Sequence, residues 1–174
     1  MPVVAADIVY VGSWDKHHYA VDVKTGKEKW RFITEDIIRS SPTVADGRVY
    51  FGSDDKHLYA VDAQTGREVW RFQSDGPVSA TPVVVNGVVY VVSGSYVYAL
   101  DSQTGSEKWR FDKGGGFTSS PAVANNLLYL GSDRRLLALN IMSGQPQWQF
   151  AIGTEADGLS TEMRLEIVDV IVSE

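Results

Sequence analysis

The sequence predicts an all-β fold built from four repeated, four-stranded antiparallel sheets. Three observations predict it: a repeat of about 40 residues, four short segments of strand character in each repeat, and a glycine-containing turn at the same place in each. Helical arrays of similar period need longer segments with helical spacing, and these are absent from the sequence. The copies occupy about residues 2–41, 42–81, 82–120 and 121–150.

Aromatic residues and prolines at fixed spacing define the repeat. The tryptophans are 40, 39 and 39 residues apart, at Trp30, Trp70, Trp109 and Trp148. The most regular segment reads AVDVKTGKEKW, AVDAQTGREVW, ALDSQTGSEKW and ALNIMSGQPQW. Prolines and tyrosines keep the same step, at Pro2, Pro42, Pro82 and Pro121, and at Tyr10, Tyr50, Tyr90 and Tyr129.

Each copy divides into four strand segments in the same order, which read PTVAD, RVYFGS, HLYAVD and REVWRF in the second copy. Their Val, Tyr, Phe and Trp residues suit a pleated sheet, and Asp, Asn, Gly and Ser separate them. Between the third and fourth segments, Asp62-Ala-Gln-Thr-Gly66 predicts a hairpin turn, because glycine accepts the positive φ that closes it. The equivalent glycines are Gly26, Gly105 and Gly144.

The tryptophan lies on the fourth segment, two residues before a phenylalanine on the same side of the strand. One indole at a fixed place in each copy predicts packing between neighbouring sheets, with the indole N–H donated to a backbone carbonyl. Alanines are expected where a facing indole leaves no room, at Ala20, Ala60, Ala99 and Ala138. Four-stranded sheets at this period predict β-propeller blades that pack face to face around an axis.

Composition excludes several classes of function. The 16 basic and 22 acidic residues give a net charge of -6, and no segment is rich in Lys or Arg, which excludes an electrostatic nucleic-acid binder. The absence of cysteine excludes disulfides and thiolate metal sites. No apolar run reaches the ~20 residues of a membrane-spanning helix, so we expect no membrane insertion.

The segment A-x-D-x-x-T-G-x-x-x-W resembles the tryptophan-docking motif of the pyrroloquinoline-quinone (PQQ)-type β-propeller repeats, over residues 2–150. That family includes quinoprotein dehydrogenases, the lipoprotein that assists outer-membrane β-barrel assembly, and sensor regions attached to bacterial serine/threonine kinases. In the dehydrogenases the resemblance implies a calcium-held quinone, an aspartate base and a vicinal cysteine disulfide. This chain has no cysteine and no acidic cluster that matches, so we expect neither a cofactor nor an enzyme.

Positions that differ between the copies are the candidates for binding. Two loops vary: the one between the second and third segments, and the connection from the tryptophan segment to the next proline. Loops at one rim of a propeller usually carry its binding surface. The candidates in these loops are Trp14, Asp15, His17, Arg39, Asp54, His57, Tyr96, Phe117 and Arg134.

Alternatives remain open within these loops. Trp14 is either an exposed anchor or packed across its loop. His17, His18 and His57, next to aspartates, indicate either a metal site or solvated loops. We favour solvated loops, because the third and fourth copies lack histidine there, and we expect no metal. Surface ion pairs are expected between Asp36 and Arg39, and between Asp133 and the arginines Arg134 and Arg135.

Four blades are fewer than the seven or eight that rings with this motif generally have. A half or partial propeller leaves an apolar face at each end, which a second copy or the rest of a longer propeller would cover. Residues 151–174 are expected to form degenerate fifth-repeat strands or a capping tail. Within them, the β-branched residues favour strand over helix for 160–172.

The sequence therefore predicts a non-catalytic scaffold, bacterial or archaeal, that binds a protein or peptide partner and completes its ring as a homodimer or within a longer chain. Two alternatives are half of a PQQ-dependent quinoprotein dehydrogenase and the ligand-sensing domain of a receptor-type serine/threonine kinase. The compartment stays open, because the resemblance favours the cell envelope whereas the first residues lack the features of a signal peptide.

Overall fold

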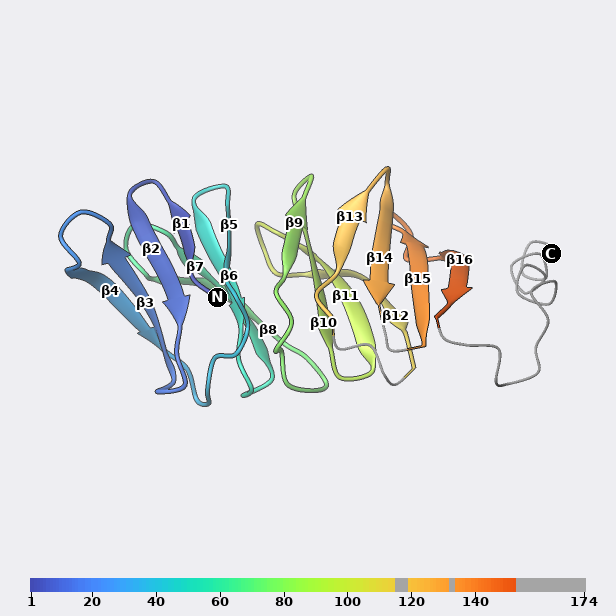
Figure 1. Ribbon diagram of the computed structural model, residues 1–174, viewed down its shortest axis with the longest axis horizontal. Helices are drawn as coiled ribbons and strands as arrows, with labels where there is room; N and C mark the ends of the chain where they lie inside the picture. Colours follow the sequence, from blue (N-terminus) through green and yellow to red (C-terminus); the bar gives the residue numbers. More distant parts are fainter. Residues whose placement is uncertain (115–118, 132–133, 153–174) are drawn as a thin grey trace.

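The chain forms sixteen β-strands over the residues that the structure, a computed structural model, describes: 1–114, 119–131 and 134–152 (Figure 1). Blade 1 contains β1 (Val3–Ala5), β2 (Ile8–Gly12), β3 (His17–Asp22) and β4 (Glu28–Ile33). Blade 2 contains β5 (Thr43–Ala45), β6 (Arg48–Gly52), β7 (His57–Asp62) and β8 (Glu68–Gln73). Blade 3 contains β9 (Val83–Val85), β10 (Val88–Ser93), β11 (Tyr96–Asp101) and β12 (Glu107–Asp112). Blade 4 contains β13 (Ala122–Ala124), β14 (Leu127–Gly131), β15 (Arg135–Asn140) and β16 (Pro146–Ala151).

Each blade is an antiparallel sheet whose strand order follows the chain. Contacts join β1 to β5, β5 to β9 and β9 to β13, so the first strand of each blade lies on the inner side of the arc. Figure 1 shows the blades in chain order, with blade 1 at the left and blade 4 at the right. This arrangement confirms the predicted all-β fold of four propeller blades. In the described ranges no helix is present that could cross a membrane.

The predicted hairpin turn forms between the third and fourth strands of every blade. In blade 2 the Asp62 carboxylate accepts the backbone N–H of Thr65 at 2.8 Å and its hydroxyl at 2.7 Å, and Gly66 has a φ of 69°. A register shift between Ala60 and Val61, a β-bulge, lies just before this turn. The same shift recurs in the other three blades.

Neighbouring blades meet at three hydrophobic clusters, one at each interface. At each one, a tryptophan and a tyrosine of one blade donate to the same carbonyl oxygen of the next. The Nε1–H of Trp30 and the hydroxyl of Tyr10 lie 3.0 and 3.1 Å from the carbonyl oxygen of Ala63. Trp70 and Tyr50 donate to Ser102, and Trp109 and Tyr90 to Ile141. The predicted indole-to-carbonyl bond is therefore present at all three interfaces.

The residue that makes room for the indole differs from the prediction. A Cβ built on Gly66 would lie 2.6 Å from the Trp30 ring, and Gly105 and Gly144 stand equally close to Trp70 and Trp109, at 2.7 Å. The turn glycine of the next blade thus faces the indole. The alanine that we expected there, Ala20, is instead the register partner of Trp30 within its own sheet, where it is fully buried.

Replacing Gly66 by alanine tests this contact, with Gly47, a glycine of similar positive φ, as the control. Gly47 has a φ of 73° and open space around its Cβ position, whereas Gly66 faces the Trp30 ring. Gly47→Ala is expected to cost about 1 kcal/mol of backbone strain, and Gly66→Ala about 1–3 kcal/mol more from overpacking. Urea denaturation followed by circular dichroism measures both losses. Equal losses would contradict the close approach.

The chain after β16 falls mostly outside the described residues. β16 ends at Ala151, and the strands or cap predicted for 151–174 lie, from residue 153 onward, outside the ranges that the structure describes.

Candidate rim binding site

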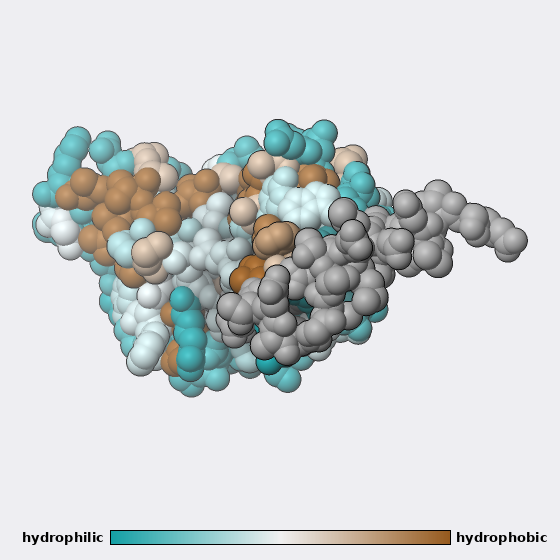
Figure 2. Space-filling view, turned by 45° about the vertical axis from the view of Figure 1, so that its right-hand side comes forward, coloured by the Kyte–Doolittle hydropathy of each residue, from teal (hydrophilic) through white to brown (hydrophobic). Residues whose placement is uncertain are grey.

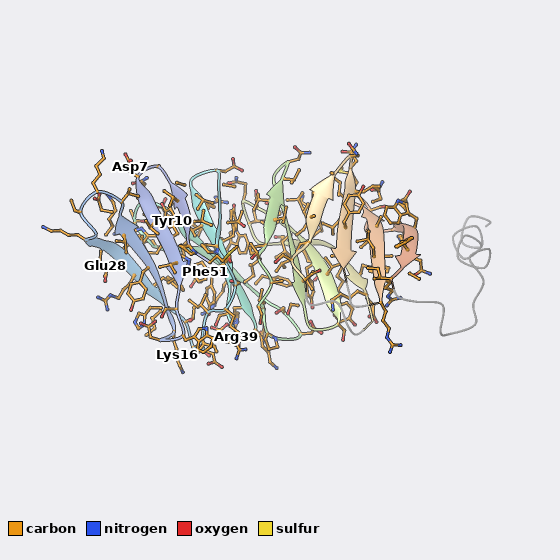
Figure 3. The ribbon with its side chains drawn as sticks, in the orientation of Figure 1. Asp7, Tyr10, Lys16, Glu28, Arg39 and Phe51 are labelled. Carbon is orange, nitrogen blue, oxygen red and sulfur yellow. The ribbon has the colours of Figure 1, made fainter. Side chains whose placement is uncertain are left out.

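The two variable loops of a blade lie together at one rim, as Figure 3 shows for Lys16 and Arg39, with Asp7 at the opposite rim. The backbone N–H of Thr34 donates to the carbonyl of Lys16 at 2.9 Å, and that of Ile38 to Ser13 at 3.1 Å. The next blade joins the same surface, because the N–H of Asp54 donates to the carbonyl of Ile37 at 2.9 Å. Loops from blades 1 and 2 therefore form one continuous rim.

An exposed tryptophan, an arginine and an aspartate meet at this rim, and we call Trp14, Arg39 and Asp54 the Trp14 cluster. The Nε of Arg39 lies 2.8 Å from Oδ2 of Asp54, and its guanidinium carbon lies 5.9 Å from the centre of the Trp14 ring. Oδ1 of Asp54 also accepts the hydroxyl of Ser79 at 3.2 Å. Trp14 is 74% exposed, so the exposed one of its two predicted placements is observed.

Arg39 pairs with a different aspartate from the one expected. Asp36 is closer in sequence, but its carboxylate accepts the backbone N–H of Ile37 at 2.8 Å. Asp54 belongs to the next blade and approaches Arg39 because the blades pack together. The other predicted surface pairs involve Asp133, which lies outside the described residues.

Asp15 and Asp55 occupy equivalent positions in the repeat and accept hydrogen bonds that hold the rim loops. Oδ2 of Asp15 accepts the Tyr19 hydroxyl at 2.6 Å, and this hydrogen bond holds the pKa of Asp15 below its usual value. Oδ2 of Asp55 accepts the Tyr59 hydroxyl at 2.8 Å and, in addition, the backbone N–H of Glu35 from blade 1 at 3.0 Å. The Asp55 carboxylate therefore ties the rim loop of blade 2 to blade 1.

We expected the histidines in solvated loops, and this prediction is wrong: all three lie on strands. His17 and His57 begin β3 and β7, and each ring nitrogen Nδ1 contacts an aspartate two residues before it in the chain. His18 is fully buried and stacks on Phe51, with 4.1 Å between ring centres. Strand alternation causes this, since His18 points to the face that packs against blade 2. Within the described ranges, no three His, Asp or Glu residues gather where they could hold a metal ion.

Two further candidates, Tyr96 and Arg134, belong to other blades. Tyr96 is on β11 of blade 3, with the Arg110 guanidinium carbon 5.4 Å from its ring centre. The carbonyl of Arg134, in blade 4, accepts the backbone N–H of Ile152 at 2.6 Å. Phe117 lies outside the described residues. Among the described candidates, the structure joins Trp14, Arg39 and Asp54 of blades 1 and 2.

One rim residue escaped the sequence analysis. Lys113 is 3% exposed, and its Nζ donates to the carbonyl of Gly94 at 2.6 Å. Burial lowers the pKa of Lys113. In blades 1 and 2 the hydroxyls of Thr34 and Ser74 donate to a carbonyl of the corresponding loop. A lysine where these two copies have a hydroxyl residue was the feature of the sequence that could have identified Lys113.

A family model described as outer membrane protein assembly factor BamB matches the chain twice, at residues 1–81 and 19–171. The chain belongs to this family. The match agrees with the predicted PQQ-type repeat, and the BamB-family model extends over all four blades. None of the curated proteins compared with the chain matches it.

Solved structures with the same fold include BamB from Moraxella catarrhalis, with a TM-score of 0.79 and 23% identity over 94% of this chain and 52% of that one. Quinohemoprotein alcohol dehydrogenase ADHIIG from Pseudomonas putida HK5 has a TM-score of 0.77 and 24% identity over 86% of this chain and 33% of that one. The computationally designed Ika8 protein has a TM-score of 0.76 and 17% identity over 86% of this chain and 48% of that one. This BamB-family chain thus spans between one third and about half of their lengths, and at these identities the likeness establishes the fold.

Proposed function

We propose that this chain is a non-catalytic scaffold that binds a protein or peptide partner at the rim formed by blades 1 and 2. The observation that carries the proposal is the Trp14 cluster, in which a 74% exposed tryptophan stands beside an arginine that an ion pair holds in place. The description of the family as an assembly factor supports a role in contacting other proteins. The ring itself is proposed to be completed by a second copy or by further blades of a longer chain.

The chemistry of the cluster indicates what the partner offers. Tryptophan and arginine are the residue types that contribute most to binding energy at protein interfaces. The side chain of Arg39 is 54% exposed while Asp54 engages its Nε, so the paired arginine stays accessible to a partner. A matching segment would place an apolar side chain on the indole and an oxygen acceptor on the guanidinium. Because the ion pair already orders Arg39, little side-chain entropy is lost on binding.

The test captures partners from a cell lysate on immobilised protein, identifies them, and compares affinities by calorimetry. Trp14→Ala and Arg39→Ala are each expected to weaken binding of a rim partner at least ~30-fold. Lys24→Ala, on the opposite rim beside Asp7, is the matched control and should leave the affinity unchanged. A partner that binds both rim variants as tightly as the wild type would overturn this site.

The likeness to quinohemoprotein alcohol dehydrogenase supports a second candidate, half of a quinoprotein propeller. The residues fit that cofactor poorly: the chain contains no cysteine, and its described part gathers no three acidic or histidine side chains. Addition of PQQ with Ca²⁺ is accordingly expected to leave the melting temperature unchanged. A rise that depends on both would favour the dehydrogenase reading over the scaffold.

A further inference from the structure

In blades 2, 3 and 4, one face of the sheet packs against the preceding blade. The same face of blade 1 is exposed. On blade 2 the corresponding face is buried against blade 1, with 0% exposure for Val49, Phe51 and Val61. The 40-residue repeat puts Val9, Val11, Tyr19 and Val21 at the equivalent places on blade 1, where all are partly exposed. Figure 2 shows hydrophobic residues gathered over blade 1, at the left of the molecule. Blade 1 thus keeps an apolar docking face.

In blades 2, 3 and 4, a backbone carbonyl accepts the indole N–H of the preceding blade, and a turn glycine leaves room for the ring. The exposed face of blade 1 has both features. Val23 stands at the position of Ala63, whose carbonyl accepts the Trp30 N–H, and it is 45% exposed where Ala63 is 5% exposed. Gly26 has a φ of 66° and nothing within 4 Å of its Cβ position, whereas the equivalent glycines each face a tryptophan. The backbone of blade 1 is therefore already shaped for a tryptophan.

Blade 4 carries the complementary face. The ring centres of Tyr129 and Trp148 lie 5.8 Å apart with 53° between planes, close to the 5.9 Å and 45° of Tyr10 and Trp30. Trp148 is 37% exposed, against 8% for Trp30, and Phe150 is 59% exposed. Neither Trp148 nor Tyr129 donates a hydrogen bond to a residue in the described ranges. The donor pair is therefore preformed, and no described residue supplies its acceptor.

We propose that blade 4 of one copy docks on blade 1 of a second copy, with Trp148 over Gly26 and its indole N–H donated to the Val23 carbonyl. The contact continues the three interfaces within the chain and repeats their donors, acceptor and glycine. Figure 1 shows the strands of both end sheets side by side in the plane of the view, so both end faces turn to the same side. A head-to-tail contact made twice would then close a ring of two copies.

The matching donor pair and docking glycine of the two end faces argue for a second copy as the occupant, and the lengths of related structures agree with it. The chain covers 52% of BamB from Moraxella catarrhalis and 48% of the designed Ika8 protein, so two copies match either in length. This inference rests on the ring-completion part of the proposed function and not on the rim site. Residues 153–174 and further blades of a longer chain are the competing occupants. A cap formed by residues 153–174 would leave the 174-residue chain a monomer.

Sedimentation velocity of the full chain over a concentration series tests the proposal. The expected result is a mass of twice 19.2 kDa for the wild type. Gly26→Ala places a methyl group where the indole docks, and Trp148→Ala removes the indole, so each should weaken the dimer at least ~30-fold. Gly47→Ala, with the same positive φ away from both end faces, should dimerise like the wild type. A wild-type monomer, or a dimer insensitive to Gly26→Ala, overturns the proposal.

Mixing the two variants distinguishes head-to-tail docking from any symmetric pairing of like faces. In a mixed pair, Trp148 of the Gly26→Ala variant meets Gly26 of the Trp148→Ala variant, which restores one junction. Mixed dimers should therefore form at concentrations at which each variant alone is monomeric. Absence of such rescue overturns the head-to-tail mode. Arg39→Ala changes a side chain at the junction of blades 1 and 2, away from both end faces. It should leave dimerisation unchanged, so that failure of the rim site and failure of ring closure give separate results.

Discussion

Replacing Trp70 by alanine is expected to lower the free energy of unfolding by about 3–5 kcal/mol. The indole is 8% exposed and lies in the cluster between blades 2 and 3, where it packs beside Tyr50 and against the turn of Gly105. Its removal leaves a cavity that two rigid sheets cannot close, and the carbonyl of Ser102 loses the indole N–H that it accepts at 3.0 Å. Chemical denaturation monitored by circular dichroism measures the loss.

Trp14→Ala is the matched control, since it makes the same substitution at a tryptophan that is 74% exposed. Its expected effect is within about 0.5 kcal/mol, the range usual for surface positions. Because each blade contacts only its neighbours, Trp70→Ala should also reduce the cooperativity of unfolding between blades 1–2 and blades 3–4. A loss below about 1 kcal/mol would mean that the indole contributes little to the interface.

The repeat explains why the fold could be predicted from the sequence. Each blade must satisfy the same packing, so the four copies provide an internal comparison, and the turn of Asp62 to Gly66 is specified by local hydrogen bonds. The indole-to-carbonyl bond followed from having one tryptophan per copy. The position of the facing glycine did not, because it depends on how one blade lies on the next.

The site could be predicted only in part for the same reason. Trp14 was identified because it departs from the repeat, but its neighbours Arg39 and Asp54 come from the end of one blade and the beginning of the next. Sequence proximity favoured Asp36 as the partner of Arg39, and blade packing selected Asp54. His18 was predicted in a loop because it was grouped with the adjacent His17 and the neighbouring aspartates. Its equivalents Leu58, Val97 and Leu136 were the signal that this position is apolar.

Replacing His18 by leucine is expected to stabilise the protein by about 1–3 kcal/mol at neutral pH. The imidazole is fully buried between Phe51 and Trp30, and neither ring nitrogen has a hydrogen-bond partner among the described residues. A buried polar group without a partner costs its desolvation, and leucine removes that cost while keeping the volume filled. The measurement is the same denaturation experiment at pH 7. A less stable variant would mean that the imidazole has a favourable partner.

The same burial predicts a pH dependence that the leucine variant should lack. Burial lowers the pKa of His18 from 6.5 to about 3, so the unfolded chain binds a proton between these values and the folded chain does not. The contribution to stability is therefore complete well above pH 6.5 and falls as the pH drops through 6.5, by about 1 kcal/mol per unit. The advantage of His18→Leu over the wild type should widen by that amount per unit between pH 6.5 and 5, above the range in which carboxylates titrate. Leu58→His, which puts an imidazole at the same place in blade 2, should add a second such pH dependence. If the unfolding free energy of the wild type, His18→Leu and Leu58→His changed with pH in the same way, the assignment would be wrong.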